Sequence, residues 1–129
     1  MKRTIVAALL ICGCMTPVSR QNPADWETVQ TGYIPPTQVQ SFTDCLMDGF
    51  GKAHVNFAQN YPVRQERRTD GYRVETLAGA NYILVSADIM FDGSVALYES
   101  RIFPATWNDL SGERAAFADC LQRYKKERP

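Results

Sequence analysis

Two carboxylates, Asp88 and Glu99, are the side chains in this sequence best placed to do acid–base chemistry together. If Asp92–Gly93 forms a two-residue hairpin turn, both acids and Arg101 lie on one face of that hairpin. A paired-carboxylate hydrolase needs two acids that flank a cleft and have well-separated pKa values. The expected face is not a cleft and Glu99 can pair with Arg101, so a solvated charge cluster is the favoured interpretation.

The single histidine, His54, gives little support to a metal site or a nucleophilic site. A Cys–His catalytic pair would need Cys45 as its thiolate, and a disulfide at Cys45 would remove that thiol. Asp44, Asp48 and His54 do not have the spacing of one compact metal site on a helix. The chain also has no glycine-rich phosphate loop. We therefore expect no metal and no cofactor.

Four arginines gather around the first expected turn of the sheet: Arg64, Arg67, Arg68 and Arg73. Such a patch could contact anionic lipid headgroups or an acidic partner. Acidic residues are interspersed among these arginines, which favours a salt-bridged, solvated hairpin. The whole chain has 14 Lys and Arg residues and 14 Asp and Glu residues. This balance gives no support to nucleic-acid binding, so we expect no nucleic-acid partner.

A group of apolar residues on the same hairpin face suggests a protein interface. The members of this candidate interface are Leu84, Met90, Val95, Leu97 and Phe103. If that face is uncovered, they form an apolar patch rimmed by charges, which is a common form of interface. The alternative is that the first hairpin or the segment around Trp26 covers them. The sequence leaves both interpretations open.

The hydrophobic pattern predicts two helices with a sheet between them. Apolar residues recur at steps of three or four from Val39 to Ala53, which predicts a helix that ends between residues 49 and 55. Ser111 is a suitable N-cap for a second helix, with Phe117 and Cys120 on its apolar face. We expect a two-layer α+β fold in which an antiparallel meander of about four strands is flanked by these N- and C-terminal helices.

The strands of the meander are expected over residues 63–68, 72–78, 82–90 and 95–102. Asp70–Gly71 and Asp92–Gly93 are the signals for its two hairpin turns. The two-residue turn at Asp92–Gly93 places Ile89 opposite Ala96. The register of the first hairpin stays open: a two-residue turn at Asp70–Gly71 would oppose like charges, and a three-residue turn would relieve this.

The N-terminus has the pattern of a secretory signal. Met1-Lys2-Arg3 is basic, and residues 4–11 form an apolar run that is too short to span a bilayer. The run ends at Ile11-Cys12-Gly13-Cys14, which resembles the lipobox of bacterial lipoproteins, with Gly13 at the small position. The resemblance covers only the first fourteen residues. It implies that Cys14 becomes the lipid-modified first residue of the mature protein.

This resemblance divides the chain into three parts: a signal peptide (1–13), a lipid anchor with a proline-rich tether (14–36), and a periplasmic α+β domain (37–129). Trp26, Tyr33 and Ile34 are conspicuous in the tether, and we favour packing on the domain surface over a dedicated binding peptide. Removing Lys2 and Arg3 with the signal leaves 12 basic against 14 acidic residues. Met15 is not the aspartate associated with inner-membrane retention, which favours the outer membrane.

Cys45 and Cys120 remain after removal of Cys12 and lipidation of Cys14, an even number in an oxidising compartment. We expect a disulfide that joins the two helices over the sheet, closing a loop of about 75 residues. The alternative is two unrelated buried thiols.

Together these features predict a lipid-anchored envelope protein that acts as a non-enzymatic interaction module. It would be an accessory subunit of an envelope complex, or an immunity or exclusion factor, and would bind an envelope protein. The alternative is a small envelope hydrolase that uses Asp88 and Glu99.

Overall fold

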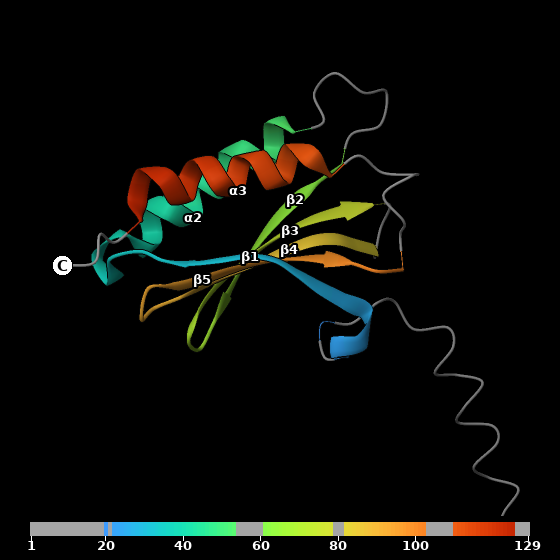
Figure 1. The fold of residues 1–129 in the computed structure, drawn as a ribbon, viewed down its shortest axis with the longest axis horizontal. Coiled ribbons are helices and arrows are strands. Elements are labelled where there is room, and N and C mark those ends of the chain that lie inside the picture. Colours follow the sequence, from blue (N-terminus) through green and yellow to red (C-terminus); the bar gives the residue numbers. More distant parts are fainter. Residues whose placement is uncertain (1–19, 21, 54–60, 79–81, 103–109, 126–129) are drawn as a thin grey trace, which may run out of the picture.

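The computed structural model describes residues 20, 22–53, 61–78, 82–102 and 110–125. Two helices lie side by side over one face of a five-stranded antiparallel sheet (Figure 1). The helices are α2 (Val39–Lys52) and α3 (Ser111–Tyr124). The sheet order is β1-β5-β4-β3-β2, and its strands are β1 (Trp26–Tyr33), β2 (Val63–Arg68), β3 (Gly71–Ala78), β4 (Tyr82–Met90) and β5 (Ser94–Ser100).

The predicted α+β fold is therefore confirmed, with one more strand than expected. The additional strand is β1, which pairs with β5 at the edge of the sheet. The prediction that residues 14–36 form a tether is therefore wrong for residues 26–33, which belong to the sheet. The domain begins before residue 37. The prolines flank the strand: Pro23 opens the short helix η1 (Pro23–Asp25), and Pro36 opens η2 (Pro36–Gln38). Most of β1 is not fully buried, so no hydrophobic alternation revealed it.

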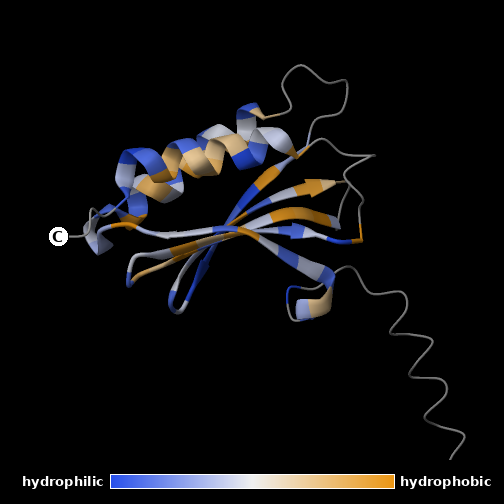
Figure 2. Cartoon of the chain, viewed as in Figure 1, coloured by the Kyte–Doolittle hydropathy of each residue, from blue (hydrophilic) through white to orange (hydrophobic). Residues whose placement is uncertain are grey.

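The core lies between the helix pair and the sheet. Phe42, Leu46 and Phe50 project from one face of α2 and are fully buried, as is Phe117 from α3. This is the face that the apolar spacing predicted. In Figure 2 the hydrophobic colours follow the strands beneath the helices, whereas the β2–β3 hairpin tip is hydrophilic. The apolar spacing of α2 thus determines which face of this helix packs against the core.

A disulfide between Cys45 and Cys120 joins α2 to α3, as the cysteine count predicted. The Cα atoms of the two cysteines are 6.0 Å apart, a separation typical of disulfides. The bond connects residues 75 positions apart in the sequence. It therefore links two neighbouring helices that are separated in sequence by the strands β2 to β5.

The predicted register of the β4–β5 hairpin is wrong by one residue. Ile89 pairs with Val95 and not with Ala96, so the loop holds three residues, 91–93. A two-residue type I′ turn needs positive φ at both of its central residues. Among the described residues only Gly93 has a positive φ, at 97°. A one-residue change in register moves every side chain of β5 to the other face relative to β4.

The β2–β3 hairpin turns at residues 69–70, one position earlier than Asp70–Gly71. Neither of the two turns that the sequence left open is formed. This register places Arg64 opposite Glu75 and Glu66 opposite Arg73, so opposite charges face each other on both pairs. Arg64 and Glu75 form an ion pair at 2.6 Å. The arginine patch is thus interleaved with acids, as the favoured interpretation of the sequence has it.

The turn between β4 and β5 leads to a prediction about pH. Asp92 accepts hydrogen bonds from the Ser94 backbone N–H (2.9 Å) and hydroxyl (2.7 Å). These two bonds hold the pKa of Asp92 below its usual value of 3.8. A carboxylate with a lowered pKa stabilises the fold above its unfolded pKa and loses that contribution as pH falls through the folded value. Asp92→Asn should therefore lower the urea midpoint at pH 6, with a deficit that shrinks towards pH 3. A deficit that grows on acidification would contradict this.

Candidate functional site

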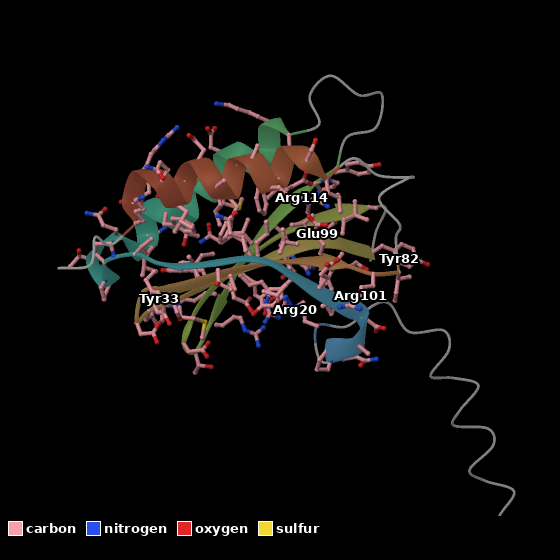
Figure 3. The ribbon with its side chains drawn as sticks, viewed as in Figure 1. Arg20, Tyr33, Tyr82, Glu99, Arg101 and Arg114 are labelled. Atoms are coloured by element: carbon pink, nitrogen blue, oxygen red, sulfur yellow. A yellow bond between two sulfur atoms is a disulfide. The ribbon has the colours of Figure 1, made fainter. Side chains whose placement is uncertain are left out.

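The sheet has a second face, turned away from α2 and α3, which we call the outer face. Strand alternation and register place these residues on it: Arg73, Glu75, Ser86, Asp88, Ala96 and Tyr98. Arg20 lies on this side of the sheet, whereas Glu99 and Arg114 lie on the helix side (Figure 3). The outer face therefore combines charged, aromatic and small residues from three neighbouring strands with one residue from the N-terminal segment.

Asp88 is at the centre of an ion-pair network on the outer face. Arg73 Nε donates to Asp88 Oδ1 at 2.7 Å, and Arg20 Nη2 donates to Oδ2 at 2.7 Å. Burial works to lower the pKa of Arg73, but the hydrogen bond and charge of Asp88 outweigh it, and the pKa is raised. Both oxygens of Asp88 are therefore engaged by guanidinium groups.

A second buried acid, Glu75, lies on the same face. Arg64 reaches it from β2 at 2.6 Å, and the Ser86 hydroxyl donates to its other oxygen at 3.3 Å. Glu75 is 1% exposed. A buried carboxylate needs such partners, because an unpaired charge is costly away from water. Each carboxylate oxygen of Asp88 and Glu75 thus accepts at least one hydrogen bond.

Arg20 is seated between two aromatic rings. Its guanidinium carbon is 4.0 Å from the centre of the Tyr98 ring and 5.1 Å from that of Trp26. The side chain is 13% exposed. Burial lowers the pKa of Arg20, and the charge of Asp88 opposes that change. These contacts attach Arg20 to the outer face through residues of β1, β4 and β5.

A hollow of about 450 Å³ lies beside this network, at the end of the sheet that carries the β4–β5 turn. Its lining residues all come from β1, β4 and β5: Thr31, Gly32, Tyr33, Asp88, Met90, Ser94, Val95, Ala96 and Tyr98. Tyr33 is 58% exposed, which is a large exposed fraction for an aromatic side chain. The hollow is thus lined by two tyrosine rings, the thioether of Met90 and the carboxylate of Asp88.

The two acids singled out by the sequence do not form a pair. Asp88 pairs with Ala96 and Glu99 with Val85, so they project from opposite faces of the sheet. Glu99 is bound by Arg114 of α3 at 2.5 and 2.7 Å. Arg101 donates to the Trp26 backbone oxygen at 3.2 Å and not to Glu99. The shared face expected for the three residues followed from the incorrect hairpin register.

The candidate apolar interface is also divided by the structure. Leu84, Val95 and Leu97 belong to the buried core, with exposed fractions of 0%, 3% and 0%. Met90 is partly buried and lines the hollow. Phe103 lies outside the described residues. The correct register turns Val95 and Leu97 towards the helices, so these residues do not form one uncovered patch.

Among the tether residues noted in the sequence, Trp26 and Ile34 are buried and Tyr33 is exposed. Cys14 and His54 lie outside the described residues. Within the part of the chain that the structure describes, no group of three His, Cys, Asp or Glu side chains could hold a metal. No helix in that part is long and apolar enough to cross a membrane.

Among the described residues, the hollow is therefore the feature of the outer face that could bind a partner. No protein-family model, curated protein or solved structure matches this chain. The sequence did not reveal the site as a whole, although it singled out Asp88 as a candidate acid, Met90 as a candidate interface residue and Tyr33 as conspicuous. Arg20 gave no signal, because Asp88 and Tyr98, two of the residues that it contacts, lie in strands far along the chain.

Proposed function

We propose that this protein is a lipid-anchored component of the bacterial envelope that binds a protein partner through the hollow on its outer face. The observation that carries the proposal is the exposed Tyr33 at a hollow that also contains Met90, Tyr98 and Asp88. Aromatic residues and Met are enriched at protein interfaces, and tyrosine is frequent among the residues that dominate binding energy.

The chemistry of Asp88 favours binding over catalysis in this hollow. Both of its oxygens accept hydrogen bonds from arginines, at 2.7 Å each. The two arginines offset the charge of the carboxylate and fix its position. A carboxylate held in this way instead acts as a fixed polar contact that orients a partner. Its separation from Glu99 by the sheet removes the support for the paired-carboxylate hydrolase.

The anchor is the second part of the proposal. The resemblance of residues 11–14 to a lipobox supports lipidation of Cys14. The disulfide between Cys45 and Cys120 supports an oxidising compartment, because such bonds persist in the periplasm and are rare in the cytosol. Met15 favours the outer membrane over the inner membrane. A small domain attached by lipid suits an accessory subunit of an envelope complex, or an immunity or exclusion factor.

Metabolic labelling tests the anchor directly. The wild-type chain should incorporate labelled palmitate, and Cys14→Ala should abolish the incorporation. Cys12→Ala is the matched control, because removal of residues 1–13 discards Cys12, and it should leave labelling intact. Labelling that survives Cys14→Ala would contradict the assignment of the anchor.

Capture of the partner tests the interface. Tyr33→Ala should reduce recovery of a crosslinked partner from native envelopes about tenfold or more, because it removes a large exposed ring at the proposed contact. Tyr82→Ala is the matched control. Tyr82 is a similarly exposed sheet tyrosine, at 50%, at the far end of the sheet from Tyr33 (Figure 3). It should leave recovery unchanged.

Equal recovery with both tyrosine variants would exclude the hollow as the interface. Thermal unfolding of each variant provides the control for folding. Failure to recover any stoichiometric partner with the intact, anchored wild type would overturn the proposed function itself.

A further inference from the structure

Arg20 differs from an ordinary surface arginine because its side chain is largely buried against the outer face. It reaches Asp88, which lies 68 residues further along the chain. The ion pair is mostly buried, with side-chain exposures of 13% for Arg20 and 18% for Asp88. Two ring contacts, to Trp26 and Tyr98, hold the guanidinium in place. Three different interactions thus converge on one side chain.

These interactions reinforce one another physically. An exposed ion pair contributes little, because water and salt screen it and the side chains lose entropy. Here the guanidinium is largely removed from water, which strengthens both the charge-assisted hydrogen bond and the cation–π contacts. Arg20 is therefore held in one place on the outer face.

Asp88 does not depend on Arg20 alone for a partner. Arg73 approaches the carboxylate from β3, with Nε at 2.7 Å and Nη2 at 3.5 Å. If Arg20 leaves, a neutral ion pair remains and no acid is stranded away from water. The domain can therefore stay folded without Arg20. The contact has the properties of a detachable latch and not of a core interaction.

The position of Arg20 determines how far the domain can lie from Cys14. Five residues separate Cys14 from Arg20, and eleven separate it from Trp26, where the sheet begins. A fully extended chain spans at most about 22 Å over the shorter distance and about 43 Å over the longer one. The latch thus halves the maximum reach of the tether.

We propose that Arg20 latches the tether onto the outer face and thereby restricts the domain to partners at its own membrane surface. The inference rests on the proposed function for the lipid on Cys14. The latch shares Asp88 and Tyr98 with the hollow. A partner in the hollow must therefore lie beside the point where the tether leaves the domain. That partner is a protein embedded in, or anchored to, the same leaflet.

Trypsin provides a direct test of the latch, because it cleaves after accessible arginines. In the lipidated mature protein on phospholipid vesicles, cleavage after Arg20 should be slow, since the site must first detach. Asp88→Asn and Tyr98→Ala should each accelerate this cleavage about tenfold or more, because opening of the latch becomes easier. The readout is the mass of the released domain, whose new N-terminus is Gln21.

Tyr82→Ala is the control for these variants and should be cleaved at the wild-type rate. Near-UV circular dichroism shows whether each variant is folded. If one latch variant unfolds, the other decides the outcome. Equal cleavage rates in wild type and a folded latch variant would overturn the proposal. The cleavage rate can be measured with or without lipid on Cys14. A missing anchor therefore shows in the palmitate labelling, whereas a missing latch shows in the cleavage rate.

Neutron reflectometry on a supported bilayer tests the restriction in reach. Arg20→Ala should thicken the water layer between bilayer and domain by about 6 Å, from the root-mean-square lengths of flexible tethers of the two sizes. Arg20→Lys keeps the charge and should shift the layer less. An unchanged layer in Arg20→Ala would show that the latch does not limit reach, whatever the cleavage rates.

Discussion

Removal of the disulfide with Cys45→Ala and Cys120→Ala together should lower the free energy of unfolding by about 2–5 kcal/mol. The bond joins α2 to α3 across 75 residues, so its loss frees a long loop in the unfolded chain. Alanine is the suitable replacement because Cys120 is 2% exposed and a serine hydroxyl would be buried there. Urea unfolding followed by circular dichroism measures the change.

Reduction of the wild-type protein is the matched control for this variant. Dithiothreitol should lower the stability of the wild type to a value close to that of the double variant, and should leave the double variant unchanged. A double variant as stable as the oxidised wild type would show that helix packing alone holds α2 and α3 in place.

Phe42→Ala should cost about 3–5 kcal/mol of stability, the range for removal of a fully buried phenylalanine. Phe42 is 0% exposed, and its ring meets Phe117 edge-on, with ring centres 5.7 Å apart. It also meets Tyr124 edge-on at 6.4 Å. The substitution therefore leaves a cavity between the helices and removes two aromatic pairs. The measurement is the same urea titration.

Phe91→Ala makes the same chemical change at an exposed position and serves as the comparison. Phe91 is 40% exposed in the β4–β5 loop, where its ring contacts Tyr72. Its loss should cost about 1 kcal/mol or less. If Phe91→Ala destabilised the domain as much as Phe42→Ala, the placement of the core between helices and sheet would be wrong.

The helices and the disulfide could be predicted from sequence because their signals are local and strong. Residues such as Phe42 and Leu46 recur with the helical period, and both are buried as that period requires. Cys45 and Cys120 were the pair left by the expected processing. These features need no knowledge of strand pairing. For that reason the α+β class was correct although the sheet was incomplete.

The arrangement of the sheet faces could not be derived in the same way. A single residue in the loop between Met90 and Ser94 decides which side chains share a face, and Asp92–Gly93 is compatible with more than one turn. The structure has a three-residue loop, with Gly93 at positive φ. This one difference separated Asp88 from Glu99 and buried Leu97.

The outer-face site was hidden for a different reason. Its parts come from the N-terminal segment and from β1, β3, β4 and β5. Arg20 and Tyr98 are brought together only by tertiary structure. The β1 strand itself is mostly polar, because an edge strand buries little of its surface. A pattern of hydrophobicity along the chain cannot show such a strand, nor the contacts it makes.

Site-specific photocrosslinking in native envelopes tests the central claim most directly. A benzophenone side chain placed at position 33 should crosslink to one envelope protein, and the product should disappear when Cys14→Ala prevents anchoring. The same group at position 82 should give no such product. Identical products from both positions, or none from position 33 in a folded and anchored protein, would contradict a partner-binding hollow on the outer face.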